Sequence, residues 1–76
     1  MKTLAEMRDG EEGIVINIVG GRGAIRNLIG LGIYPGTRIK VLGRIGGAML
    51  VSVNGSKFAI GRGLAMKVIV SDRKKI

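Results

Sequence analysis

The chain has 76 residues, a formal net charge of +8, and neither cysteine nor histidine. A chain of this length has room for one small domain, and its composition excludes disulfide bonds and the usual side-chain ligands of transition metals. Its apolar runs are far shorter than the ~20 residues of a membrane-spanning helix. We therefore expect a single domain over residues 1–71, a basic C-terminal tail over residues 72–76, and no insertion into a membrane.

Positive charge is concentrated in the body of the chain. No acidic residue occurs between Glu12 and Asp72, whereas eight basic residues do. These are Arg22, Arg26, Arg38, Lys40, Arg44, Lys57, Arg62 and Lys67. Such a surface predicts an acidic partner: a nucleic acid, an anionic membrane surface or a protein with an acidic face. Solubility alone is the simpler explanation of the same charge.

The first part of the chain contains two candidate extended segments. Residues 3–7 predict a short strand or cap, with Leu4 and Met7 turned inward. Residues 13–19 alternate with a period of two, which predicts a strand. Its two faces carry Ile14, Ile16 and Ile18 on one side and Val15, Asn17 and Val19 on the other.

A glycine-rich connection follows over residues 20–36. Within it, Ile25, Leu28 and Ile29 have the i, i+3, i+4 spacing of a short helix that lays an apolar face on a sheet. The chain then returns through the Tyr-Pro-Gly sequence of residues 34–36, where proline presets the first corner of a β-turn and glycine accommodates the second. The leading Gly-Gly-x-Gly lacks the ending of a phosphate-binding loop, so we interpret it as a hinge.

The remaining segments predict an all-β fold. Strands are expected over residues 37–42, 48–53, 56–60 and 66–71, with a flexible link over residues 43–47 and a tight single turn over residues 61–65. Asn54-Gly55 is the pair most typical of a two-residue type I′ hairpin. Five or six short strands at regular spacing predict a small barrel, because closure protects strand edges that would otherwise pair with other chains.

The chemistry of catalysis is missing from this pattern. General acid–base work normally uses histidine or a carboxylate held in a cleft, and here four of the five carboxylates precede the barrel body. Glu11 and Glu12 are adjacent, so on a strand they point to opposite faces. The sequence therefore predicts a protein that is not an enzyme, with no catalytic residue, no cofactor and no dedicated metal site.

Several motifs together resemble the ferrous iron transport protein A (FeoA) family, and the resemblance covers nearly the whole chain from Leu4 to Val70. The motifs are an early turn at Gly10, the strand with Ile14, Ile16 and Ile18, the run Leu28-x-x-Leu31-Gly32-Ile33-x-Pro35-Gly36, the hairpin Val51-x-Val53-x-Gly55 and the turn Ile60-Gly61-Arg62-x-Leu64-Ala65. The resemblance implies a small SH3-like barrel of five to six short strands, with one short helix between the first and second barrel strands.

The resemblance also implies a role. Such proteins act in the cytoplasm, beside a membrane ferrous-iron permease that carries a G-protein-like domain (FeoB-type), and are thought to modulate it by binding its cytosolic region. The chain is then a regulatory protein of iron homeostasis, held at the inner face of the membrane through its partner. The residues expected to bind that partner are Arg22, Arg26, Leu28 and Tyr34, with Arg38, Lys40 and Arg62 steering the encounter.

Two alternatives stay open at this point. The first is a nucleic-acid-binding barrel, which the near absence of aromatic side chains for base stacking disfavours, since only Tyr34 and Phe58 occur. The second is self-association of the barrel into a homo-oligomer, with a transition metal bridging copies through carboxylates such as Glu11 or Glu12.

Overall fold

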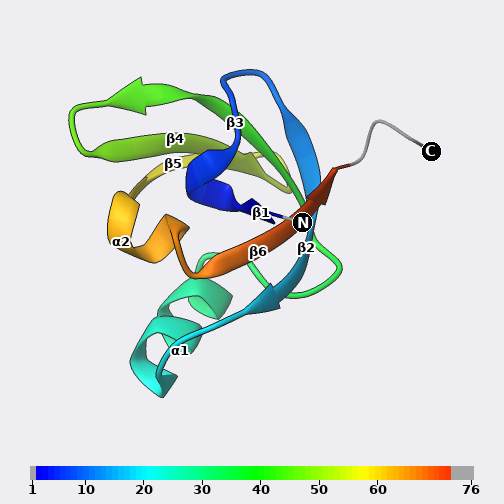
Figure 1. Ribbon diagram of the computed structural model, residues 1–76, viewed down its shortest axis with the longest axis vertical. Helices are drawn as coiled ribbons and strands as arrows, with labels where there is room; N and C mark the ends of the chain where they lie inside the picture. Colours follow the sequence, from blue (N-terminus) through cyan, green and yellow to red (C-terminus); the bar gives the residue numbers. More distant parts are fainter. Residues whose placement is uncertain (1, 73–76) are drawn as a thin grey trace.

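The computed structural model describes residues 2–72, which form one six-stranded antiparallel sheet. The sheet order is β1-β6-β2-β3-β4-β5. The strands are β1 (Lys2–Thr3), β2 (Glu12–Ile18), β3 (Arg38–Ile45), β4 (Ala48–Val53), β5 (Ser56–Gly61) and β6 (Val68–Asp72). Three helical segments complete the fold: the 3₁₀ helix η1 (Leu4–Glu6), the helix α1 (Arg22–Gly30) and the single turn α2 (Arg62–Ala65). Figure 1 shows the sheet curled on itself, with α1 at one end of the molecule.

The inner face of the curled sheet forms one aliphatic core. β3 and β4 contribute alternate residues, so Ile39, Val41, Met49, Val51 and Val53 are all buried. The core continues into β2, β6, the helices and the loops with Leu4, Met7, Val15, Ile18, Leu28, Ile33, Ile60, Ala65, Val68 and Val70. Leu4 and Met7 therefore face inward as predicted, although a 3₁₀ turn after β1 places them there. Within residues 2–72, no helix combines the length and apolarity needed to cross a bilayer.

The inward side chains of β2 differ from the predicted alternation. The sequence placed Ile14, Ile16 and Ile18 on one face, but Ile16 is exposed while Val15 and Ile18 are buried. The register of β2 against β6 shifts between Val15 and Asn17. Such a β-bulge inserts one residue and turns the following side chains to the opposite face. Val15 before the bulge and Ile18 after it consequently both face the core.

The predicted flexible link between β3 and β4 is wrong. β3 continues to Ile45, which pairs with Ala48, and only Gly46 and Gly47 form the turn. The ladder hydrogen bonds of this hairpin outweigh the weak strand preference of glycine. The hairpin of β4 and β5 is confirmed, because Asn54 and Gly55 have φ angles of 52° and 84°, both in the left-handed region that a type I′ turn requires.

Helix α1 lies in the predicted connection between β2 and β3. Leu28 is fully buried, and Ile25 packs against the core from its edge, as the spacing indicated. Ile29 is instead 50% exposed. Successive helical residues are about 100° apart, so Ile29 lies to one side of the face that Leu28 centres on.

The return from α1 to β3 follows the predicted turn. The Thr37 amide donates to the Tyr34 carbonyl at 3.0 Å, and Gly36 takes a φ of 97° at the second corner behind Pro35. At the far end of the chain, β6 runs through Asp72, whose backbone pairs with Gly13. Residues 73–76 of the expected tail lie outside the described residues.

Candidate partner-binding surface

The seven residues predicted to bind a partner lie in three separate places. Arg22 and Arg26 project from α1, and Arg62 begins α2 beside the β3–β4 turn. Tyr34, Arg38 and Lys40 line a groove on the outer face of the sheet. The structure thus brings Tyr34, Arg38 and Lys40 together in the groove and Arg22 and Arg26 together on α1, and leaves Arg62 apart from both groups.

Leu28 is a correction to the predicted set. Its side chain has no exposed surface and belongs to the core. A partner cannot reach it directly, because α1 packs on the barrel through this residue. The apolar residues that α1 does expose are Ile29 and, at its C-terminal cap, Leu31, which is 37% exposed.

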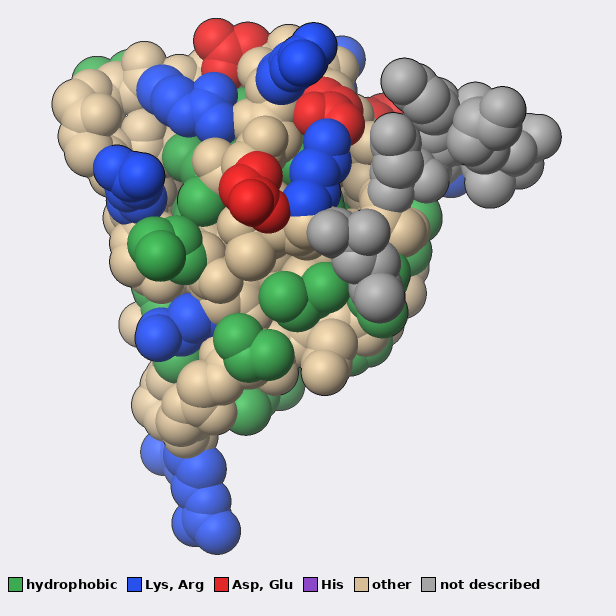
Figure 2. Space-filling view, viewed as in Figure 1, with side chains coloured by type: hydrophobic (Ala, Val, Ile, Leu, Met, Phe, Trp, Pro, Cys, Tyr) green, Lys and Arg blue, Asp and Glu red, His purple; other side chains and the backbone are tan. Residues whose placement is uncertain are grey.

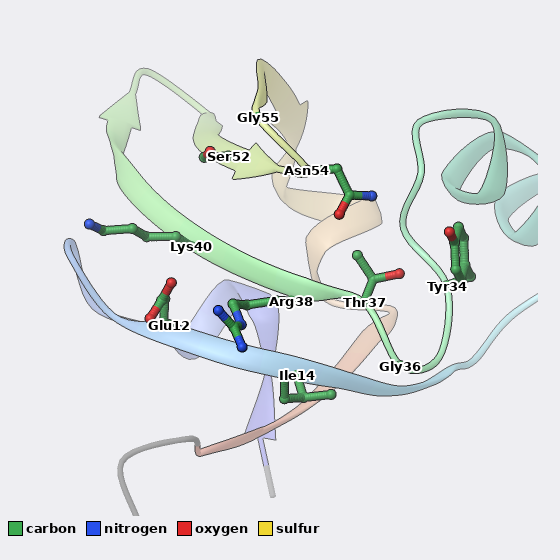
Figure 3. Close-up of a pocket in the computed structure, with 10 residues that line it drawn as sticks. All are labelled: Glu12, Ile14, Tyr34, Gly36, Thr37, Arg38, Lys40, Ser52, Asn54 and Gly55. Carbon is green, nitrogen blue, oxygen red and sulfur yellow. The ribbon is translucent and has the colours of Figure 1, made fainter. Parts of the chain in front are cut away.

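The groove is a hollow of about 590 Å³ on the outer face of β2, β3 and β4. It is lined by Glu12, Ile14, Tyr34, Gly36, Thr37, Arg38, Lys40, Ser52, Asn54 and Gly55. Figure 3 shows these residues coming from β2, β3, β4, the β4–β5 turn and the loop before β3, with Tyr34 closing the end nearest α1. Tyr34 is 44% exposed, so its ring is available to a ligand.

Strand pairing determines where the charged side chains of the groove lie. Arg38 and Lys40 alternate with the buried Ile39 and Val41, which sends both cations outward. Lys40 is opposite Glu12 on β2 and opposite Ser52 on β4, while Arg38 is opposite Ile14. Neither cation has a carboxylate oxygen within 4.0 Å in the described part of the chain, where the ion pairs are Lys2–Glu11 and Arg44–Asp9.

Thr37 is the one polar residue buried in the wall of this groove. It is 6% exposed, and its hydroxyl oxygen has no hydrogen-bond partner within residues 2–72. Leaving such a group unpaired costs about 1–3 kcal/mol. Figure 3 shows its side chain between Asn54 and Tyr34. Sequence reasoning missed Thr37, because only the curvature of the loop and β3 reveals that this threonine is buried.

Arg44 is a cation that the structure uses internally. Its Nη1 atom donates to Asp9 Oδ1 at 2.7 Å, and Nη2 donates to the backbone carbonyls of Ala5 and Met7. These bonds tie the segment after η1 to β3. Arg44 is therefore occupied, unlike the cations of the groove.

The second internal ion pair joins the N-terminal strand to the start of β2. The Lys2 ammonium donates to Glu11 Oε2, and the Arg8 amide donates to Glu11 Oε1 at 2.8 Å. The Arg8 amide, and then Lys2, hold the pKa of Glu11 below its ordinary value of 4.5. The side chains of residues 2–71 bring no three His, Cys, Asp or Glu together in a way that could hold a metal ion.

The end of the molecule formed by α1 is purely cationic. Arg22, Ile25, Arg26 and Ile29 line a shallow hollow of about 300 Å³ on its surface. On the face seen in Figure 2, acidic side chains are confined to the upper half, and only Lys and Arg charge the lower half, where α1 lies. The described carboxylates occupy η1, the turn after it and the start of β2, which explains this division.

Comparisons with known proteins agree with this architecture. The family model for the FeoA domain matches residues 2–72. A protein of Methanocaldococcus jannaschii named "Putative Fe(2+) transport protein A" is 46% identical over 72 residues, covering 95% of this chain and 88% of that protein. A crystal structure of an iron uptake regulatory protein (FeoA) superposes with a TM-score of 0.88 at 44% identity, covering 95% of this chain and 96% of the other.

A third comparison concerns the fold. The zinc-complexed FeoA of Stenotrophomonas maltophilia, described as an SH3 domain protein, superposes with a TM-score of 0.81 at 23% identity, covering 93% of this chain and 91% of the other. The predicted SH3-like, mostly β architecture is thereby confirmed, with α1 between β2 and β3 as expected. With a family model over 2–72 and two relatives above 40% identity, this chain belongs to the FeoA family.

Proposed function

We propose that the protein is a non-catalytic accessory factor of ferrous-iron uptake, which works in the cytoplasm by binding the cytosolic region of a membrane ferrous-iron permease with a G-protein-like domain. Membership of the FeoA family carries this proposal, together with the relative named for Fe(2+) transport. The cationic surface supports a binding role, since charged patches of one sign attract and orient partners of the opposite sign.

Helix α1 and the turn behind it form the proposed docking face. Arg22 and Arg26 flank the exposed part of Ile25 and Ile29, and Tyr34 follows on the adjoining loop. Arginine and tyrosine are common anchors of interfaces, because they combine a large contact area with hydrogen bonding. Arg38, Lys40 and Arg62 lie beyond this face and contribute mainly to the rate of encounter.

A charge reversal on α1 tests the docking face. Arg26→Glu replaces an attractive charge by a repulsive one, and we expect it to weaken binding to the purified permease by roughly tenfold or more, as for a central interface charge. Biolayer interferometry with the full-length permease in detergent measures the affinity. Lys57→Glu is the matched control, since Lys57 is an exposed cation on β5 and not on α1. Equal affinities of the native protein and Arg26→Glu would place the docking face elsewhere.

A salt titration against mixed RNA separates this proposal from nucleic-acid binding. A nucleic-acid-binding barrel would bind RNA tightly, with an affinity that falls steeply on a log–log plot against salt. We expect only weak binding, because residues 2–72 offer the bases just two aromatic rings, and the Phe58 ring is partly buried against the core. Tight RNA binding together with no affinity for the permease would overturn the proposed function.

A further inference from the structure

We propose that the groove on β2, β3 and β4 binds an extended acidic segment of a protein partner, in which two carboxylate side chains are separated by one residue. The inference rests on the proposed function only for the identity of the partner. Its chemistry comes from the residues that line the groove, and it gives Arg38 and Lys40 a direct binding role in place of steering.

The balance of charge in the groove favours an anionic ligand. Its lining holds two cations, Arg38 and Lys40, and one carboxylate, Glu12. Both cations are exposed and lie more than 4.0 Å from every described carboxylate oxygen, so a ligand does not have to break an existing ion pair to reach them. All the lining residues except Glu12 belong to residues 13–71, a stretch of the sequence that contains no acidic residue.

The spacing of the two cations favours an extended chain. Arg38 and Lys40 are two residues apart on the same face of β3. A strand advances about 3.3 Å per residue, so their Cα atoms are roughly 6.6 Å apart, and an extended ligand repeats every second side chain at the same interval. A segment lying along β3 with an acid-x-acid pattern can therefore meet both cations where they stand. A compact anion would have to draw the two side chains together.

The polar groups of the groove suit the backbone of such a segment. Ser52 and Asn54 face the groove from β4 and its turn, and the Tyr34 ring closes one end (Figure 3). The Thr37 hydroxyl is more than nine-tenths buried in the same wall and has no partner within residues 2–72. The hydroxyl oxygen itself has almost no accessible surface, so a backbone carbonyl or amide of a bound segment would pair with it only after the neighbouring groove residues move apart.

A protein segment fits these features better than a nucleic acid. Single-stranded nucleic acids are held by rows of aromatic side chains on which successive bases stack, and Tyr34 is the only aromatic residue of the groove. A phosphate backbone would also place a negative charge against Glu12 at each step. Two separate carboxylates on a peptide can avoid Glu12 while reaching Arg38 and Lys40.

A short synthetic peptide tests the groove without the permease. The probe is the acetylated, amidated heptapeptide Gly-Ser-Asp-Leu-Asp-Ser-Gly, titrated calorimetrically into the full chain at low salt. Two peptides of matched composition or length serve as controls: one carries Asn-Leu-Asn at the centre, and the other carries Asp-Asp-Leu. We expect the Asp-Leu-Asp peptide to bind most tightly. Equal binding of Asp-Leu-Asp and Asn-Leu-Asn would overturn the proposal.

Variants of the protein assign the peptide to the groove. Arg38→Gln and Lys40→Gln should each weaken binding of the Asp-Leu-Asp peptide by about two- to fivefold, the range of a solvent-exposed ion pair. Glu12→Gln should strengthen it by about twofold, because a repulsive charge is removed. Lys67→Gln is the matched control, since it changes the net charge equally but lies in the turn before β6, beside Gly20. A loss with Lys67→Gln equal to that with Lys40→Gln would overturn the assignment.

Thr37 supplies a second, charge-independent test. Thr37→Val keeps the shape of the side chain and removes the hydroxyl, so we expect a more heat-stable protein that binds the peptide more weakly. Thr37→Ser keeps the hydroxyl and should keep the binding. An unchanged peptide affinity in Thr37→Val, with the variant shown folded by circular dichroism, would overturn the role of the hydroxyl in the groove.

The two proposals fail separately. If the native protein binds the Asp-Leu-Asp peptide but not the permease, the proposed function is overturned and the groove proposal stands. A different result would overturn the groove proposal and leave the proposed function standing. In it, the Arg38→Gln, Lys40→Gln double variant still binds the permease, and the native protein binds all three peptides equally. Displacement of the Asp-Leu-Asp peptide by polyuridylate at a lower concentration than by the peptide itself would show a nucleic-acid site and also overturn the groove proposal.

Discussion

The cationic residues of this barrel fall into two groups: some form ion pairs within the fold, and others face solvent without one. Arg44 and Lys2 are bound to Asp9 and Glu11, and Arg44 also holds two backbone carbonyls. Arg38 and Lys40 carry the same charge and have no such partner among the side chains of residues 2–71. Composition cannot make this distinction, because it depends on which carboxylate lies within reach after folding. The residues left without an ion pair are the ones available to a ligand.

Glu11 gives a pH dependence at the residue scale. Its pKa is lower in the folded protein than in the unfolded chain, because the Arg8 amide and the Lys2 ammonium favour the charged form. Its contribution to stability is therefore complete above the unfolded pKa, near 4.5, and is lost as the pH falls through the folded pKa. We expect Glu11→Gln to lower the Tm at pH 7 and to have a smaller effect at pH 3.

Differential scanning calorimetry at the two pH values measures this effect. Glu12→Gln is the matched control, since Glu12 is exposed and forms no ion pair with the side chains of residues 2–71. A Tm difference between the native protein and Glu11→Gln that is the same at pH 3 and pH 7 would contradict the assigned ion pair.

Among the elements, the regular ones could be predicted from the sequence and the irregular ones could not. The alternation in β4, the Asn54-Gly55 hairpin and the short helix between β2 and β3 each follow from local spacing, and the structure confirms them. The prediction of which β2 side chains face inward was wrong, because a bulge is a property of the pairing with β6 and not of either strand alone. The prediction of a flexible link over residues 43–47 was wrong for a similar reason, since hairpin pairing extends β3 through a glycine-rich sequence.

The close approach of β2 and β6 makes Gly13 the sensitive position of the sheet. A Cβ atom at this position would lie 2.7 Å from the backbone carbonyl oxygen of Ser71, which cannot move aside without breaking the strand pairing. We expect Gly13→Ala to lower the free energy of unfolding by about 1–3 kcal/mol, the usual range for overpacking. Urea denaturation followed by circular dichroism measures the change.

Gly23 is the matched control for this substitution. It lies in α1, has no neighbour within 4 Å of an added Cβ and has a φ outside the left-handed region. Gly23→Ala should raise stability by about 0.5–1 kcal/mol, because alanine loses less backbone entropy in a helix. A Gly13→Ala variant as stable as Gly23→Ala would show that the two strands separate more easily than the structure indicates.

At the scale of the whole molecule, the described acidic side chains are confined to one end, whereas cations occur at both. The described carboxylates gather around η1 and the start of β2, and the end with α1 carries cations alone (Figure 2). The sequence predicted the excess of positive charge. It did not predict how the exposed cations divide among α1, the groove and Arg62 on α2, because that division depends on how the sheet curls. The helical spacing did indicate that Leu28 is buried, so the error was to count it among the partner contacts.

This division predicts a salt-dependent encounter with the permease. Electrostatic steering raises association rates by about 10- to 1,000-fold, and salt removes the effect because it screens the charges. We expect the association rate constant, measured by stopped-flow fluorescence, to fall roughly tenfold or more between low and high salt. The double variant Arg38→Gln, Lys40→Gln should show a shallower dependence. A rate that does not change with salt would contradict an electrostatic role for the surface.

The place of β6 in the sheet bears on how the protein is made. β6 is the last strand of the sheet to leave the ribosome, yet it pairs with both β1 and β2. The hairpins of β3, β4 and β5 join neighbours in the chain and can assemble during translation. Until β6 emerges from the exit tunnel, β1 has no strand to pair with, and the apolar side chains of β2 stay uncovered. A nascent chain stalled before residue 68 is therefore a natural substrate for chaperones and quality-control proteases.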